Sequence, residues 1–333
     1  MAQVKTKEGG IVKNNDLLLK NKKSKRGVGE REKLSPLTTV MLVVLIIYVF
    51  TMVFLILWTL LTSVKHDVDF KDNILGLPRP HSPHNPKFIW GWRFSNYVTV
   101  FDYFFVKKLV EVDGVNKLVT FGMWDMFKFG LLYALGCAFF KAFVPLITAY
   151  CCAKFDFFLS KVVRTIVIVA MILPIIGALP SEIKIAKSLG LYDKIWGLWV
   201  MRANFLGMYF LVFHGMFRAL PAAYTEAAKI DGAGNLSILV LIVLPLVKNT
   251  FFTVFLLQFI AFWNDYNTPL LYMPSYPTIA YGLYEVTSTT QNTMSSTPMR
   301  MAAAMLMLLP ILAIFLTFHK RLLGNLTVGG LKG

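Results

Sequence analysis

Histidine and cysteine are the side chains of this chain best suited to holding a metal or attacking a substrate, and their spacing favours neither. His81 and His84 share a proline-rich segment with no third ligand nearby. Cys137, Cys151 and Cys152 fall within or at the end of one apolar run, without metal or disulfide spacing. The motifs GxxxxGK[ST], HExxH and GxSxG are also absent. We therefore expect no catalytic residue, no metal site and no cofactor bound by this chain.

Lys141 is the clearest charge inside an apolar run. Charges at such positions usually mark ion or solute pathways, and the alternative is a lysine that faces the interior of a helix bundle or snorkels to an interface. The apolar runs hold no series of carboxylates such as a proton-driven carrier needs. Any transport by this chain is therefore expected to draw its energy from another subunit.

A polar segment at 220–246, LPAAYTEAAKIDGAGNLSILVLIVLPL, separates two apolar runs. Pro221 suits the first turn of a helix, the next residues are good helix formers, and Gly232 follows as a stop signal. The pattern predicts a helix over 221–230 that is about 15 Å long.

One face of this predicted helix is small and shallow, and it carries a single carboxylate. By the spacing of three and four residues it comprises Ala223, Glu226, Ala227 and Ile230. Such a face is poorly suited to lipid and well suited to docking into a groove of another protein.

The rest of the chain indicates a membrane protein. Of its 333 residues 56% are hydrophobic and 16% are charged, and the mean hydropathy is +0.60. A soluble domain carries about 25% charged residues. Apolar runs of about 20 residues can each cross a bilayer, and they predict six spans near 37–62, 128–150, 161–180, 196–214, 243–263 and 301–318.

An amino-terminal tail at 1–36 holds ten Lys and Arg residues against four acids, and so contributes +6 of the net charge of +16. Because the tail adjoins an apolar run, we interpret it as a disordered cytoplasmic flank near anionic lipid and not as a nucleic-acid site. With six spans both termini are expected in the cytoplasm, including a tail at 319–333. The connector at 63–127 is then extracytoplasmic, and residues 128–318 form a core of five spans.

The polar segment resembles the EAA loop of the permeases of ABC importers. Glu226, Ala227 and Ala228 are followed after three residues by Gly232, and after nine more by the apolar stretch that ends at Pro245. The variant found here is similar to that of the carbohydrate subfamily of maltose-type transporters. Further similar segments are FSNYVTVF (94–101), FWNDYNTPLLYM (262–273), MAAAMLMLLPILAIFL (301–316) and LTVGGLKG (326–333). The insert at 106–127 has no counterpart in this pattern.

The resemblance implies an all-α permease of the type I importer fold in a bacterial or archaeal cell membrane. It also implies its partners, namely a second permease, two cytoplasmic ATPases that bind ATP and Mg, and an extracytoplasmic solute-binding protein. The residues expected to couple to the ATPase are Glu226, Ala227, Ala228, Asp231, Gly232 and Pro245. Glu226 would carry a charged contact, the alanines would allow close approach, and Gly232 would form the turn.

A sugar path through the bundle needs hydrogen-bond partners for hydroxyl groups and rings that stack on sugar faces. The candidates are Asn204, Tyr209, Gln258 and Asn264, although each could instead bridge two helices. The outer segment at 272–299 is rich in Tyr, Ser, Thr and Asn and is expected to contact the binding protein. The alternative function is an ABC importer permease for a phosphate, peptide or polyamine.

Overall fold

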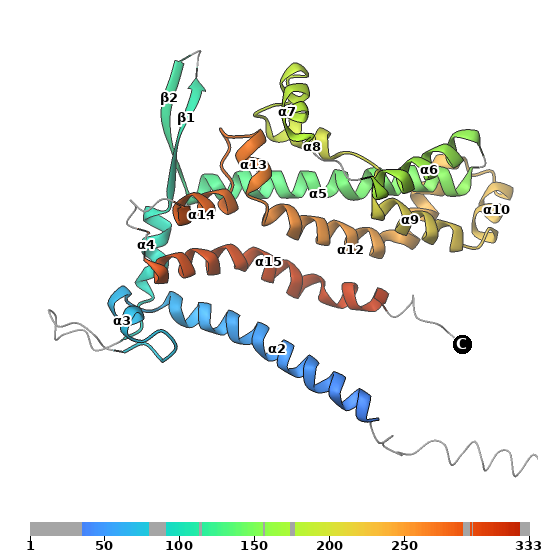
Figure 1. Cartoon of the computed structure of the whole chain (residues 1–333). Helices are drawn as coiled ribbons and strands as arrows, with labels where there is room; N and C mark the ends of the chain where they lie inside the picture. The colour runs from blue at the N-terminus through green and yellow to red at the C-terminus, as the bar shows by residue number, and fades with distance from the viewer. Residues whose placement is uncertain are drawn as a thin grey trace, which may run out of the picture. The chain divides into compact units, whose positions relative to one another are not determined.

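The structure is a computed structural model of the chain, and it describes residues 35–79, 91–112, 115–155, 157–173, 177–288, 294 and 296–326. The predicted tail at 1–36, apart from its last two residues, and residues 327–333 lie outside the described part. The elements, shown in Figure 1, are α2 (Pro36–Ser63), α3 (Asp67–Asp72), α4 (Ser95–Tyr103), β1 (Phe105–Val112), β2 (Val115–Gly122), α5 (Met123–Lys154), α6 (Phe158–Ile172), α7 (Leu179–Ser188), α8 (Ile195–Arg202), α9 (Met208–Ala219), α10 (Ala223–Ile230), α11 (Asn235–Ile238), the π-helix η1 (Leu239–Val243), α12 (Leu244–Trp263), α13 (Asn267–Tyr272), α14 (Ile279–Ser288) and α15 (Thr297–Leu326).

The chain divides into two compact units, Met1–Ile56 and Leu57–Gly333. The described part of the smaller unit is mostly the amino-terminal portion of α2. The larger unit is built around α5, which packs against α12, α9 and α8. One end of the larger unit carries the strands with α4 and α14, and the opposite end carries α10 (Figure 1).

Small residues on α5 allow its neighbours to approach closely. Ala134, Ala138 and Ala142 recur every four residues, so they share one face, and all three are fully buried. On another side, a Cβ at Gly136 would fall inside the indole of Trp199, which donates a hydrogen bond of 3.1 Å to the carbonyl of Leu132. Close contacts at small residues are the usual means by which helices pack in a membrane.

Four described helices are long and apolar enough to cross a membrane, namely Pro36–Ser63, Met123–Lys154, Asn235–Trp263 and Thr297–Phe318. They correspond to four of the six predicted spans. The other two predicted spans, 161–180 and 196–214, are not continuous helices in the structure.

Local backbone chemistry explains both differences. Helix α6 has 15 residues, about 22 Å, and ends where Leu173 turns extended (φ −75°, ψ 119°) ahead of Pro174. The run at 196–214 is divided into α8 and α9 by residues 203–207, and Gly207 adopts φ +127°, which favours glycine. Hydropathy alone does not detect such breaks, because the residues around them are apolar.

The prediction of an all-α fold is wrong for the insert at 106–127, which contains an antiparallel β-hairpin. Strands β1 and β2 pair from Phe105 opposite Gly122 to Val112 opposite Val115. Their many β-branched residues favour extended backbone. Val106 is buried, whereas Leu109 and Leu118, which lie opposite each other, are 70% and 64% exposed.

A buried polar cluster fixes the carboxyl-terminal end of α2. The amide of Asn96 donates hydrogen bonds of 2.8 Å to the carbonyls of Ser63 and Lys65, and the Ser63 and Tyr97 hydroxyls lie 2.6 Å apart. Burial lowers the pKa of Lys65, whose ammonium donates to the carbonyl of Asn73 (2.6 Å). Asn96 and Tyr97, which belong to a segment similar to one in the permease family, therefore join α4 to the end of α2.

Candidate functional site: the loop at α10 and the polar side chains of the bundle

Helix α10 occupies the centre of the predicted coupling loop and is two residues shorter than expected. It begins at Ala223 and not at Pro221, because its first α-helical hydrogen bond, between residues four apart, runs from the N–H of Glu226 to the carbonyl of Ala222. Pro221 precedes the helix and accepts a long bond of 3.4 Å from Tyr224. The predicted carboxyl-terminal end at Ile230 is confirmed.

Gly232 closes α10 in a left-handed conformation with φ +80°. Its N–H donates to the carbonyl of Lys229 (3.1 Å), and the N–H of Ala233 donates to the carbonyl of Ala228 (2.9 Å). These two bonds form a Schellman motif, which satisfies the last carbonyls of a helix and requires a positive φ. The helix stop signal predicted at Gly232 from the sequence is confirmed.

The face predicted from the sequence is exposed. Ala223, Glu226, Ala227 and Ile230 are all exposed, Ile230 by 87%. Within the described part of the chain, no Lys or Arg nitrogen lies within 4.0 Å of the Glu226 carboxylate. This surface is therefore small and apolar, with one unpaired negative charge.

Ala228 faces the opposite way, into the chain's own core. It is 7% exposed and belongs to a cluster with Phe217, Val247 and the partly buried Ala233. The inner face of α10 therefore belongs to the same buried cluster as the end of α9 and the start of α12. At the start of the loop the Lys154 ammonium donates to the carbonyl of Leu220 (3.2 Å), which ties the loop to α5 as well.

The remaining two predicted coupling residues, Asp231 and Pro245, lie after α10 and at the start of α12. Asp231 is exposed at the carboxyl-terminal end of α10. Pro245 is exposed in the first turn of α12, directly after the π-helical turn at Leu239–Val243, where the N–H of Leu244 donates to the carbonyl of Leu239. Because proline has no N–H, the wider turn accommodates the break in the hydrogen-bond ladder.

The four predicted substrate-path residues do not form one cluster. The Gln258 amide donates to the Tyr209 hydroxyl (2.7 Å), which joins α12 to α9, and both side chains are half-buried. Asn204 accepts a hydrogen bond of 2.7 Å from the Lys141 ammonium. Asn264 is exposed directly after α12 and donates to the carbonyl of Ile260 in the last turn of that helix.

Further polar contacts hold the segment after α12, and the sequence did not single them out. Asp265 accepts from the N–H groups of Asn267 and Thr268 and from the Tyr133 hydroxyl, at 3.0–3.1 Å. The only sequence signal was the FWND stretch itself. Burial and the nearby Glu182 carboxylate raise the pKa of Tyr272 to about 12, so Tyr272 stays a donor to that carboxylate (2.8 Å).

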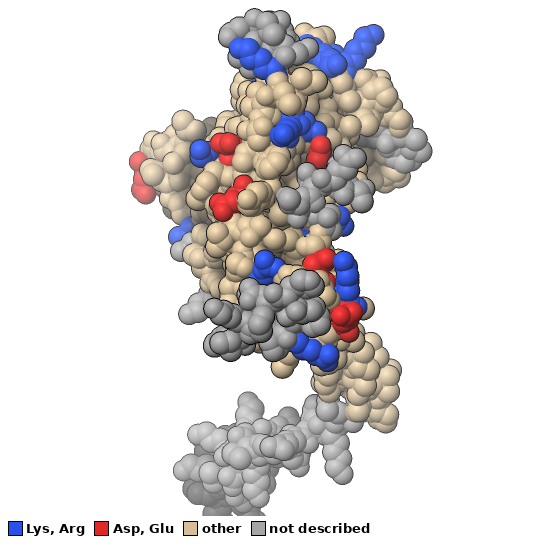
Figure 2. All heavy atoms as spheres, turned by 90° about the vertical axis from the view of Figure 1, so that its left-hand side faces the viewer, with Lys and Arg blue, Asp and Glu red and all other residues tan. Residues whose placement is uncertain are grey.

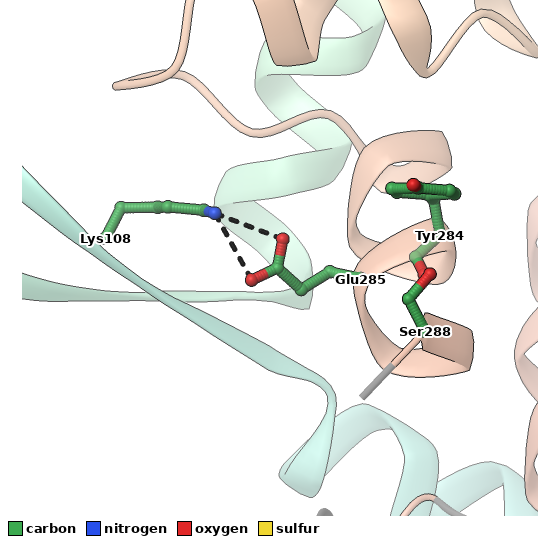
Figure 3. A network of polar contacts seen from close by, with 4 residues as sticks. All are labelled: Lys108, Tyr284, Glu285 and Ser288. Atoms are coloured by element: carbon green, nitrogen blue, oxygen red, sulfur yellow. Dashed lines mark hydrogen bonds and ion pairs between the residues drawn. The ribbon is translucent and has the colours of Figure 1, made fainter. Parts of the chain in front are cut away.

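The hairpin is fixed to α14 by a half-buried ion pair (Figure 3). The Lys108 ammonium lies 3.1–3.2 Å from both oxygens of Glu285 and 4.8 Å from the ring centre of Tyr281. Burial opposes the charge of Lys108, but the contacts with Tyr281 and Glu285 outweigh it and raise the pKa of Lys108. Seen from this end, charged side chains are scattered over a mainly uncharged surface (Figure 2).

Comparisons with known proteins identify this arrangement. Residues 141–324 match the family described as "Binding-protein-dependent transport system inner membrane component". The maltodextrin transport system permease protein MdxG of Bacillus subtilis is 32% identical over 209 residues, covering 61% of this chain and 73% of that protein. The sn-glycerol-3-phosphate transport system permease protein UgpE of Yersinia pestis bv. Antiqua is 29% identical over 211 residues, covering 62% of this chain and 72% of that protein.

A solved structure shows the same fold. It is the crystal structure of a bacterial ABC transporter involved in the import of the acidic polysaccharide alginate. One of its chains superposes with a TM-score of 0.62 at 20% identity, covering 85% of this chain and 95% of that chain.

The family match covers more than half of the 333 residues of the chain. Proteins of this family are multi-pass permease subunits of ABC importers and have no ATPase activity of their own. The chain therefore belongs to the family of binding-protein-dependent transport system inner membrane components.

Proposed function

We propose that this permease imports a sugar or oligosaccharide and forms one half of the pathway, with a paralogous permease as the other half. In this proposal α10 docks on one of two cytoplasmic ATPases that bind ATP and Mg. The end with the hairpin and α14 faces an extracytoplasmic binding protein, and both termini are cytoplasmic.

The observation that carries the coupling proposal is the two-sided character of α10. Its outer face, with Glu226 and Ala227, is exposed and shallow, whereas Ala228 on its inner face belongs to a buried cluster that includes residues of α9 and α12. A rigid element that is bound on one side and packed on the other can pass a displacement from the ATPase into the bundle. An unpaired carboxylate on the outer face would gain a charge-assisted hydrogen bond from a basic partner.

The proposal of a sugar rests on the half-buried Tyr209 and Gln258 and on the similarity to a maltodextrin permease. Tyr209 offers a ring and a hydroxyl, and Gln258 offers two donors and an acceptor. Because the two side chains bond to each other, a sugar hydroxyl would have to insert between them or use their remaining capacity. Asn264, which is exposed beyond the end of α12, is a weaker candidate than this pair.

The proposed contact with the binding protein uses the segment at 272–299 together with the hairpin. Tyr284 and Leu109 are exposed at this end, and the ion pair of Lys108 with Glu285 makes the two elements one surface. A hairpin of two strands is only marginally stable alone in water. Its ion pair with α14 and the burial of Val106 therefore hold it in place.

Purification in mild detergent, with identification of all co-purifying proteins, tests the assembly. Recovery of an ABC ATPase and a second permease is expected. The complex is then reconstituted in proteoliposomes with its binding protein, and uptake of labelled maltodextrins is compared with uptake of glycerol 3-phosphate, a peptide and a polyamine. If the proteoliposomes take up only glycerol 3-phosphate, only the peptide or only the polyamine, that solute is the substrate and the proposal of a sugar is wrong.

A further inference from the structure

Lys141 lies near the middle of a membrane-spanning helix. In α5 it follows Met123 by 18 residues and precedes Lys154 by 13, which places it about 27 Å and about 20 Å from the two ends at 1.5 Å per residue. A lysine at that depth reaches the membrane surface only with difficulty. Charges kept there are costly and generally serve a solute or ion pathway.

A second cation, Arg202, lies close to Lys141 at the end of α8, and its charge acts on the Lys141 ammonium. Both side chains are half-buried, and their hydrogen-bond partners are neutral. Lys141 donates to the Asn204 amide oxygen (2.7 Å), and a terminal nitrogen of Arg202 donates to the Thr268 hydroxyl (3.3 Å).

Neither cation forms an ion pair with a carboxylate of the described residues. Across the described residues no carboxylate oxygen lies within 4.0 Å of Lys141 or Arg202, and the buried Nε of Arg202 has no hydrogen-bond partner there. Asp265, three residues before Thr268, already accepts hydrogen bonds from Tyr133, Asn267 and Thr268. Two cations with an unused donor in an apolar bundle therefore favour the entry of an anion.

The two cations border an interruption of the helix, which the sequence did not reveal. Arg202 ends α8, Asn204 lies in the irregular segment at 203–207, and Gly207 precedes α9 with φ +127°. Irregular backbone at membrane depth is tolerated where it is buried in protein or lines a polar passage. Interrupted helices are also where many transporters bind their solutes.

We propose that Lys141, Arg202 and Asn204 form a binding site for the anionic group of the transported solute, a carboxylate or a phosphate on a sugar. This inference rests on the proposed function and narrows its substrate class to acidic carbohydrates. The planar guanidinium of Arg202 suits a bidentate contact with two oxygens of such a group, and Lys141 supplies a point charge. Asn204, which Lys141 already orients, offers its amide N–H groups to neighbouring hydroxyls.

Ligand binding to the purified complex tests this site without depending on the specificity of the binding protein. The probes are glucuronate, glucose 6-phosphate and glucose, and the readout is the concentration dependence of the thermal unfolding midpoint of the detergent-purified complex. We expect a saturable rise with glucuronate or glucose 6-phosphate and none with glucose. The anionic probe that gives the larger rise identifies the anion as carboxylate or phosphate.

Three variants locate the effect. Lys141→Gln and Arg202→Gln should each weaken binding of the anionic probe at least tenfold, because each loses a charged hydrogen bond. Lys141→Arg should retain most of the affinity for the anionic probe. The control Lys248→Gln removes an exposed lysine of α12 and should leave the affinity unchanged.

An equal response to glucose and to the anionic probes in the wild-type complex, or no response to any of them, would overturn the site. Unchanged affinity in both glutamine variants would do the same. Co-purification of the ATPase, together with ATP hydrolysis stimulated by the binding protein, tests the proposed function separately. If the ATPase co-purifies and its stimulated hydrolysis is normal but the anionic probes do not bind, the anion site is wrong and the proposed permease function is still supported.

Discussion

Replacement of Gly232 tests whether backbone geometry sets the direction of α10. Gly232 has φ +80°, and a Cβ added to it would meet no atom within 4 Å. A substitution therefore strains the backbone without a clash inside this chain. For a residue with a Cβ, the left-handed region costs about 1–2 kcal/mol, and a β-branched residue is disfavoured there even more strongly.

The backbone can relieve this strain by a change of φ at Gly232. Rotation of φ at Gly232 to a negative value would break the hydrogen bonds from Gly232 to Lys229 and from Ala233 to Ala228. Since about 1.4 kcal/mol corresponds to a factor of ten, Gly232→Ala should reduce the population of the native loop about 5- to 30-fold. Gly232→Val should reduce it further, and Gly232→Asn least, because asparagine tolerates this conformation.

The assay measures the amount of ATPase that co-purifies and the ATP hydrolysis that the loaded binding protein stimulates. Gly234→Ala is the matched control, because Gly234 also has open space around it but a φ of −71°. We expect all variants to insert normally and to rank as glycine, asparagine, alanine, valine. Normal coupling in the valine variant, or equal loss in the asparagine and valine variants, would refute the reasoning.

Three further predictions concern the two ends of the larger unit. Glu226→Ala should weaken docking of the ATPase at least tenfold, because losing a charged hydrogen bond costs about 1.5–3 kcal/mol. The control Ser237→Ala should change docking little. Equal co-purification of the ATPase with both variants would contradict the role of the carboxylate. A double-mutant cycle of thermal unfolding with Lys108→Met and Glu285→Gln should show a coupling energy of about 0.2–1 kcal/mol. Additive effects of the two substitutions would mean that the ion pair does not hold the hairpin. In a background without native cysteines, Thr287→Cys should react with an impermeant thiol reagent from outside intact cells and Ser237→Cys should not, and the reverse pattern would invert the proposed orientation.

The coupling loop was largely predictable because its signals are local. The end of α10 at Ile230 and the left-handed Gly232 follow from a glycine directly after a run of helix formers. The spans that correspond to α2 and α5 were found from length and hydropathy, which depend on composition alone. The start of α10 was misplaced by two residues because proline is compatible both with a first helical turn and with the residue before it.

Features that depend on distant partners could not be read from the sequence. The interruption between α8 and α9 lies in an apolar run, where Gly207 and Asn204 were the only signals. The neighbourhood of Arg202 and Lys141 depends on how α8 packs on α5. The pairing of Lys108 with Glu285 spans 177 residues of sequence, and no local pattern encodes it.

The small face of α5 also matters for the order in which the chain is synthesised. Helix α5 is complete at Lys154, but α12, its main packing partner, is complete only at Trp263, 109 residues later. At about 5–20 residues per second, ribosomes need roughly 5–20 s to make that stretch. Throughout this interval Ala134, Ala138 and Ala142 must wait for their partner. Alanine is apolar enough to face lipid meanwhile and small enough to be covered later, so this face suits both the nascent and the finished permease.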